Sequence, residues 1–192
     1  AIAALPVQKW YRKKLIVRCG FMWSLNTARA YGEEAKETHK VTLLEKKAFQ
    51  ESAHIVVTTS AMKSYASEKH DVSPGKITII PNYVNTQLFS PDGRNERDSK
   101  TICFVGRLAK EKNLESLFDA VRNMNVRLLI VGDGPLRAEL EAKSSQVKAE
   151  VTFLGTLRQK EIAACLRRSA VFLLPSIWEG QPKALLEAMA CG

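Results

Sequence analysis

The chain has 192 residues, of which 45% are hydrophobic and 26% are charged, with a formal net charge of +9. These values are ordinary for a globular protein, and the length suits one large domain or two small ones. No run of about eighteen apolar residues occurs, and the apolar opening AIAALPV is short and lacks a preceding basic region, so the sequence predicts neither a membrane-spanning helix nor a signal peptide.

The positive charge is uneven. Residues 1–94 hold 14 Lys and Arg against 8 Asp and Glu, whereas residues 95–192 hold 15 against 12. Five basic residues lie close to Trp10 and Tyr11 in the sequence: Lys9, Arg12, Lys13, Lys14 and Arg18. They form either a solvated helix face or a surface attracted to anionic lipid, to which each basic residue contributes about 1 kcal/mol. No nucleic-acid-binding motif occurs, so no nucleic-acid partner is expected.

The cysteines are far apart and form no CxxC pair; they are Cys19, Cys103, Cys165 and Cys191. This usage favours reduced cysteines that serve packing. We therefore expect a cytoplasmic protein, with peripheral contact to a membrane as an option.

Strand and helix patterns alternate along the first half of the chain. Short apolar, β-branched runs predict strands at 14–19, 54–59 and 76–81, and apolar residues at helical spacing predict helices at 37–52 and 60–70. Such alternation is typical of an α/β fold with a mainly parallel sheet. The polar stretch 88–100 contains Pro91 and Gly93 and is interpreted as a linker.

The rhythm becomes very regular after the linker. Strands are predicted at 102–106, 127–132, 151–155 and 171–175, and helices at 113–123, 135–148, 159–168 and from Pro182 onward. A doubly wound domain usually has one or two more strands than these four units supply. The sequence is therefore expected to be truncated at both ends.

The segment LPSIWEGQPKALLEAMACG places two acids, Glu179 and Glu187, seven residues apart around a turn that opens a helix. Pro182 suits the first helical position, and the free N–H groups of that turn, with Lys183, suit an anion. In a purely structural interpretation, Glu179 caps the helix electrostatically and Glu187 lies on the surface.

Two loops upstream also follow strands. In FVGRLAKEKN, Arg107 and Lys112 could together neutralise a diphosphate, although basic residues are common in loops. IVGDGPLRAEL resembles a dinucleotide fingerprint, but Arg137 stands where a third glycine would be required, which disfavours a nicotinamide enzyme. Gly132 and Gly134 fit either a loop beside a nucleotide or a tight strand-to-helix turn.

Together these segments resemble the retaining glycosyltransferases of family 4, in order and in spacing. IIPNYVNTQLFSP resembles the segment of that family which joins its two domains, and the likeness covers about residues 10–192. It implies a GT-B fold with two Rossmann-like domains. Residues 1–87 would be the rear of the N-terminal acceptor domain, 88–100 the interdomain linker, and 101–192 the truncated donor domain.

The resemblance also implies roles for individual residues. Arg107 and Lys112 match the basic pair on the donor diphosphate, Glu179 the acid at the sugar, and Glu187 the acid at the ribose hydroxyls. The remaining matches are the backbone turn around sugar and phosphate, the base pocket and the glycine loop: Gly180, Gln181, Lys183 and Ala184; Leu154, Gly155 and Leu157; Gly132 and Gly134.

The chain departs from the family pattern at several of these positions. Gln181 and Lys183 replace residues that are commonly apolar, and Tyr83 and Asn85 stand where Gly and Asp are usual. The family's N-terminal glycine-rich loop is absent. These departures bear on which sugar is selected.

The implied reaction is transfer of a sugar, expected to be a hexose, from a nucleotide-diphosphate sugar to an acceptor hydroxyl with retention. The acceptor would be a saccharide or a lipid-linked glycan. No DxD motif occurs, so neither a metal ion nor a cofactor is expected beyond the donor substrate. The alternatives are a non-catalytic or inactive sugar-nucleotide-binding fragment and a GT-B epimerase or phosphorylase. The 192 residues alone are expected to be inactive.

Overall fold

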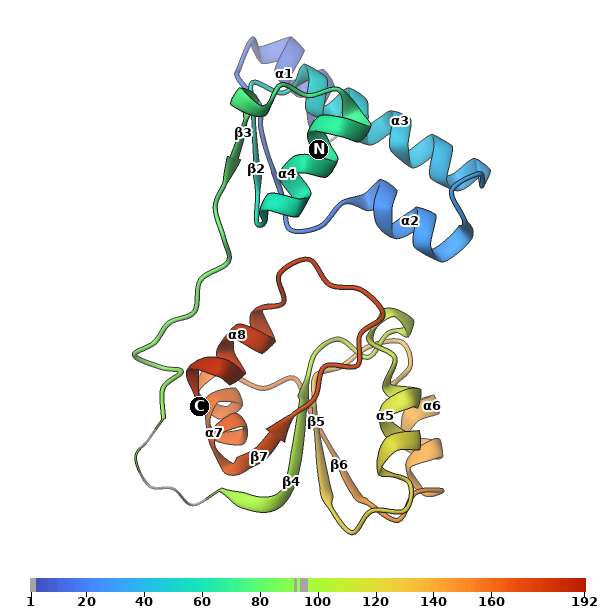
Figure 1. Ribbon diagram of the computed structural model, residues 1–192, viewed down its shortest axis with the longest axis vertical. Coiled ribbons are helices and arrows are strands. Elements are labelled where there is room, and N and C mark those ends of the chain that lie inside the picture. Colours follow the sequence, from blue (N-terminus) through green and yellow to red (C-terminus); the bar gives the residue numbers. More distant parts are fainter. Residues whose placement is uncertain (1–2, 92, 94–96) are drawn as a thin grey trace. The chain divides into compact units, whose positions relative to one another are not determined.

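The computed structural model describes residues 3–91, 93 and 97–192, and it has the predicted α/β fold with parallel strands (Figure 1). The internal contacts divide the chain into two units. The first comprises residues up to Asn82 together with Glu179–Gln181, and the second comprises Tyr83–Trp178 and Pro182–Gly192.

The first unit contains helices and strands in alternation. In chain order they are α1 (Ala4–Tyr11), β1 (Ile16–Cys19), α2 (Trp23–Tyr31), α3 (Lys36–Glu51), β2 (His54–Val57), α4 (Ser60–His70), a 3₁₀ turn η1 (Pro74–Lys76) and β3 (Ile77–Ile79). The predicted strands and helices of this half are confirmed, with ends displaced by at most two residues.

The sheet of the first unit is parallel, in the order β1-β2-β3. Its register aligns Val17 with Ile55 and Ile55 with Ile77, and all three side chains are buried. Phe49 of α3 and Met62 of α4 pack against this row. Apolar residues at matched positions on neighbouring strands thus form one continuous core.

Helix α2 was not predicted from the sequence, and its N-terminus shows why. The amides of Trp23 and Ser24 donate to the carboxylate of Glu45 at 2.8 and 3.1 Å, so the cap comes from α3 rather than from a neighbouring residue. By contrast, α4 has a local cap, because Thr59 Oγ1 accepts from the amide of Met62 at 3.2 Å.

Glu45 is also the centre of a buried polar cluster. Its carboxylate accepts from the Ser24 hydroxyl and from His70 Nε2, the latter at 3.1 Å, and Tyr65 lies 3.0 Å from the same hydroxyl. Burial acts to raise the pKa of Glu45, but the hydrogen bonds from His70, Ser24 and the α2 amides outweigh it and lower the pKa. The cluster ties α2, α3 and α4 together.

The second unit has a longer sheet. Its elements are β4 (Asp98–Val105), a 3₁₀ turn η2 (Lys110–Lys112), α5 (Leu114–Val121), β5 (Arg127–Val131), α6 (Arg137–Ser144), β6 (Glu150–Gly155), α7 (Gln159–Arg168), β7 (Ser169–Phe172) and α8 (Lys183–Ala190). The strands are parallel, in the order β6-β5-β4-β7.

The side chains of β4 and β5 alternate between the two faces of this sheet. Ile102 and Phe104 join the core beneath α5 and α6, whereas Cys103 and Val105 join the core that includes α7 and α8. Figure 1 shows the corresponding helix layers on either side of the sheet. A strand buried on both faces reads as a continuous apolar run, which is why this half of the fold is clear from its sequence.

Three predicted boundaries need correction. The stretch 88–100 is not a linker throughout, because Phe89 is buried in the second core and β4 already begins at Asp98; residues 92 and 94–96 lie outside the described part. β7 begins at Ser169, two residues before the predicted start. Pro182 precedes α8 as its N-cap instead of occupying the first helical position.

All four thiols are free. Burial raises the pKa of Cys103 to about 12, with a further contribution from Cys165, and burial together with Glu45 raises the pKa of Cys19 to about 11. Cys103 is fully buried in the second core. The prediction of cysteines that serve packing is therefore confirmed for Cys103.

Candidate functional site

The strand order of the second unit identifies one edge of its sheet as a binding edge. β5 and β6 extend the sheet on one side of β4, whereas β7 pairs with its other side. The chain connections therefore diverge between β4 and β7, and in open α/β sheets ligands bind outside the carboxyl ends of the strands at such a point. The segments that leave these two ends are residues 106–113 and 173–182.

The first segment carries the predicted basic pair. Arg107 follows Gly106 directly after β4 and is exposed. Lys112 is half-buried at the end of η2, and Asn113 then takes the left-handed conformation, with φ of 51°, before α5 begins. Both cations thus lie on the loop at the carboxyl end of the central strand.

Hydrogen bonds hold this segment against the one that follows β7. Asn113 Nδ2 donates to the carbonyl oxygen of Pro175 at 3.3 Å, and the amide of Ile177 donates to the carbonyl oxygen of Glu111 at 2.9 Å. Lys112 lies between Glu111 and Asn113 in the chain, so both of its neighbours bind the β7 segment. Sequence reasoning did not single out Asn113, and its only signal there is an Asn directly before a helix.

Gly132 and Gly134 lie where two loops meet. The amide of Gly106 donates to the Val131 carbonyl at 3.0 Å, and that of Leu108 donates to the Asp133 carbonyl at 2.9 Å. A Cβ on Gly132 would collide with the carbonyl of Gly106, and one on Gly134 with the backbone of Leu108. Close approach of the Arg107 loop therefore explains both glycines.

The end of β6 adjoins the same loops. The amide of Gly132 donates to the carbonyl of Gly155 at 2.7 Å. Arg137 Nη1 lies 3.3 Å from where a Cβ on Gly155 would be, and the Arg137 side chain pairs with Glu141 at 2.8 Å. Leu154 and Leu157, assigned to a base pocket, are half-buried and pack against the second core.

Helix α8 supplies the other predicted residues. Lys183 is its exposed first residue, and its Nζ lies 5.4 Å from the ring centre of Tyr83, a cation–π distance that sequence reasoning did not foresee. Ala184 packs half-buried against the second core. Among the α8 residues, the amide of Leu186 bonds back to Pro182, whereas the amides of the first turn precede the helical ladder.

Glu187 is buried, with 9% of its surface exposed. Burial raises the pKa of its carboxyl, although Lys183 one turn earlier acts in the opposite direction. The interpretation of Glu187 as a surface residue is therefore wrong. A carboxylate that is buried at a cost, on the edge where ligands bind, is characteristic of a functional group.

Three predicted site residues, Glu179, Gly180 and Gln181, group with the first unit. All three are half-buried. The residues that the second unit brings to one sheet edge are Arg107, Lys112, Gly132, Gly134, Gly155, Lys183, Ala184 and Glu187. Within the described residues, no group of three or more His, Cys, Asp or Glu is arranged to hold a metal ion.

Comparison with known families bears on this arrangement. The sequence profile described as "Glycosyl transferases group 1" matches residues 86–192. The chain belongs to this family. The match covers the whole of the sheet edge described above, from the loop after β4 to α8.

Two curated relatives are similar over most of the chain. A GDP-mannose-dependent alpha-mannosyltransferase of Mycolicibacterium smegmatis is 38% identical over 144 residues, which are 70% of this chain and 36% of that protein. A human phosphatidylinositol N-acetylglucosaminyltransferase protein is 30% identical over 146 residues, 72% of this chain and 30% of that protein. This group 1 chain thus spans about a third of the length of each.

The solved structure of Anabaena HepE with UDP and glucose superposes with a TM-score of 0.77 at 16% identity, covering 100% of this chain and 55% of that one. This likeness concerns the fold, which is the GT-B fold of such glycosyltransferases. In the described part of this group 1 chain, no helix is both long enough and apolar enough to cross a bilayer.

Proposed function

We propose that this chain supplies the donor-binding part of a retaining, family 4 glycosyltransferase that uses a nucleotide-diphosphate sugar and transfers a hexose. The supporting observation is the edge between β4 and β7. There the loop with Arg107 and Lys112 is hydrogen-bonded to the segment leading to α8, whose start carries Lys183 and whose second turn buries Glu187.

The diphosphate would bind to the cations and to the start of α8. Arg107 can offer a planar fork and Lys112 a point charge, while the first amides of α8 are aligned with the positive end of its dipole. As the bond to the sugar breaks, negative charge grows on the leaving diphosphate. Fixed donors aimed at such charge contribute about 3–4 kcal/mol each to the transition state.

Glu187 would bind the ribose of the donor. A carboxylate accepts two hydroxyl hydrogen bonds, and those bonds would replace the water that burial removes. Because hydrogen bonds to the charged form favour it, donor binding would lower the pKa that burial has raised. The ribose site and the unusual carboxyl would then have one explanation.

The other residues follow from the same proposal. Glu179 would contact the sugar hydroxyls near the reacting carbon, and the backbone at 180–184 would surround the sugar and the phosphate. Leu154, Gly155 and Leu157 would adjoin the base, with Gly132 and Gly134 in the loop beneath it. We assign no metal ion to the reaction, and the departing phosphate would accept the proton of the acceptor hydroxyl.

The acceptor class is proposed from the relatives' names. Phosphatidylinositol N-acetylglucosaminyltransferase is named for a lipid acceptor, and a galactosyltransferase of Escherichia coli, 33% identical over 141 residues, is named for a diphosphoundecaprenol acceptor. We therefore propose a saccharide acceptor carried on a lipid, and peripheral contact with the membrane that holds it.

The donor assignment is tested by binding. Thermal shifts of the chain with UDP-, GDP- and ADP-sugars identify the nucleotide, and calorimetry gives its dissociation constant. Lys112→Gln is expected to weaken binding roughly 10- to 100-fold, the value of a lost charge-assisted hydrogen bond. Lys110→Gln is the matched control, because Lys110 begins the same 3₁₀ turn, is exposed, and is not assigned to the donor.

Equal loss in both variants, or no loss in either, would refute the phosphate site. Release of nucleotide diphosphate only when an acceptor is present would support transfer over epimerisation or phosphorolysis. Donor binding with no transfer by any preparation that contains Glu179 and an acceptor domain would favour a binding module. NMR of the product's anomeric proton tests retention.

A further inference from the structure

We propose that α1 and the three basic residues after it form a docking surface for a bilayer that contains anionic phospholipid. The surface consists of Val7, Trp10 and Tyr11 on one helix face and Arg12, Lys13 and Lys14 beside it. The inference goes beyond the donor site and does not depend on it, because all these residues belong to the first unit.

The outer face of α1 is apolar. Val7, Trp10 and Tyr11 occupy positions i, i+3 and i+4 and therefore lie on the same side of the helix. Their exposed fractions are 55%, 84% and 65%. Trp and Tyr have an apolar body and a polar tip, the combination that favours the boundary between lipid headgroups and acyl chains.

The inner face of α1 holds the helix on the protein. Leu5 is buried, Gln8 Nε2 donates to the carbonyl oxygen of Glu51 at 3.3 Å, and Lys9 pairs with the Glu51 carboxylate at 2.8 Å. α1 thus has an anchored side and an exposed apolar side. A helix with no function on its outer face would place polar residues there.

The charge beside the apolar stripe is positive only. Residues 9–14, KWYRKK, are all exposed, and the first acidic residue of the chain is Glu33. Arg12 ends the helix in the left-handed conformation, with φ of 49°, so that Lys13 and Lys14 follow outside the helix. Complementary charge therefore selects an anionic partner.

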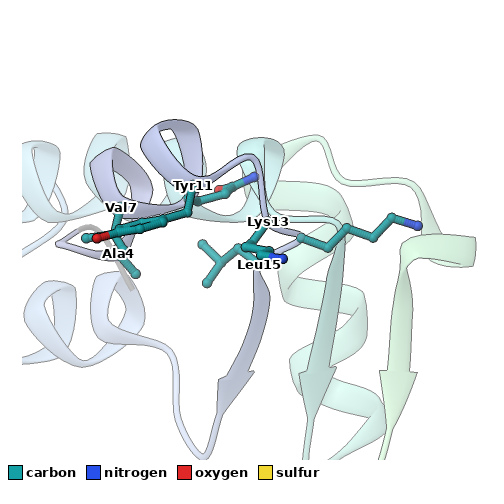
Figure 2. Close-up of a pocket in the computed structure, with 7 residues that line it drawn as sticks. Ala4, Val7, Tyr11, Lys13 and Leu15 are labelled. Carbon is teal, nitrogen blue, oxygen red and sulfur yellow. The ribbon is translucent and has the colours of Figure 1, made fainter.

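A hollow of about 280 Å³ lies between α1 and the segment that follows it. Figure 2 shows Tyr11 extending beside Val7 and Ala4, with Leu15 across from them and Lys13 adjacent. The hollow thus combines an apolar lining with ammonium groups at its margin. This pairing fits the junction of a phospholipid, where an apolar chain meets an anionic headgroup.

A bilayer explains both parts of this surface, whereas a nucleic acid would use only the charge. Lipid attraction is expected to amount to about 1 kcal/mol for each basic residue near an anionic surface and to weaken with salt. Insertion of the aromatic face adds affinity that salt does not remove. The two contributions can therefore be separated experimentally.

The test is flotation of the chain with vesicles of phosphatidylcholine alone or mixed with phosphatidylglycerol. Binding is expected only to the mixed vesicles and should weaken as salt rises. The double variant Lys13→Gln/Lys14→Gln should lower the partition coefficient about 30-fold, the product of two contributions of about fivefold each. Trp10→Ser/Tyr11→Ser should lower it about tenfold or more, from lost apolar burial.

Matched controls come from residues of the same kind elsewhere. Lys148→Gln/Lys160→Gln removes the same charge from exposed sites of the second unit, and Tyr31→Ser removes an aromatic side chain that is 68% exposed on α2. Both should leave the partition coefficient unchanged. Circular dichroism and the donor-induced thermal shift should be unaltered in every variant, which keeps this test separate from that of the donor site.

Three outcomes would overturn the proposal. They are absence of binding to the mixed vesicles, equal binding to the neutral ones, and binding that neither the lysine nor the aromatic double variant reduces. Binding to an oligonucleotide in preference to the mixed vesicles would also overturn it and would assign the basic residues to a nucleic acid.

Discussion

Asn113 Nδ2 donates a hydrogen bond to the carbonyl oxygen of Pro175 and thereby joins the loops that leave β4 and β7. The amide is itself oriented by Ser116, whose hydroxyl donates to Asn113 Oδ1 at 3.0 Å. Asn113 also has a positive φ, a conformation that Asn tolerates better than most residues. One residue thus sets both the backbone turn before α5 and the position of the β7 segment.

Replacement of Asn113 separates these two roles. Asn113→Gly keeps the positive φ and removes the hydrogen bond, so it should cost about 0.5–1.5 kcal/mol in the free energy of unfolding. Asn113→Ala should cost about 1 kcal/mol more, because alanine is strained at this φ. Urea unfolding measures both. Equal stability of the two variants would show that the backbone conformation contributes nothing.

Gly134→Ala should destabilise the second unit. The new Cβ would lie 2.7 Å from the backbone nitrogen of Leu108, and backbone cannot swing aside as a flexible side chain can. Overpacking of this kind costs about 1–3 kcal/mol. Gly75→Ala is the control, since its Cβ would meet nothing closer than Ser73 Oγ at 3.9 Å. A Gly134→Ala protein as stable as the wild type would contradict the close approach of the two loops.

Glu187→Gln should stabilise the fold and weaken donor binding. The raised pKa means that the folded state favours the protonated acid, so the wild type loses stability as pH rises from the usual 4.5 through the folded pKa. The variant should therefore be more stable than the wild type at pH 7 and equal to it below about pH 4.5. Thermal melts across this range measure the gap.

The control for Glu187 is Glu150→Gln, an exposed carboxyl at the start of β6. It should show no such gap. If Glu187→Gln were less stable than the wild type at pH 7, the carboxylate would have a stabilising partner, and the burial argument would fail.

Glu45→Gln should have the opposite pH dependence. The lowered pKa of Glu45 means that its carboxylate stabilises the fold above its unfolded pKa, and that this stability is lost as pH falls through the folded pKa. The variant should lose about 1.5–3 kcal/mol at neutral pH, with a smaller loss in acid. Urea unfolding at both pH values checks this. Glu37→Gln, an exposed change on the same helix, should cost far less.

Local signals explain which elements could be predicted. Helices α4 and α7 have the predicted bounds, and both have caps within their own sequence: Thr59 Oγ1 for α4 and the Glu161 carboxylate, which accepts from the Arg158 amide at 2.7 Å, for α7. Helix α2 was missed because its cap, Glu45, lies about twenty residues away in the chain. Long-range capping leaves no local pattern.

The candidate site shows the same division. Arg107 and Lys112 could be placed at a strand end from the sequence, because parallel strands present their carboxyl ends at one edge. The burial of Glu187 could not, since it depends on how α8 packs against the sheet. The glycines illustrate a third case: Gly132 and Gly134 were visible as a motif, but their cause is the backbone of Gly106 and Leu108, which pairs with them only after folding.

The strand order has a consequence for synthesis of the second unit. β4 pairs on one side with β5, which follows directly, but its other edge waits for β7, where Cys103 aligns with Phe172. A nascent chain halted before residue 169 carries that apolar edge uncovered, the condition in which strands of different molecules join. The edge between β4 and β7 is therefore the last part of this sheet to close on the ribosome.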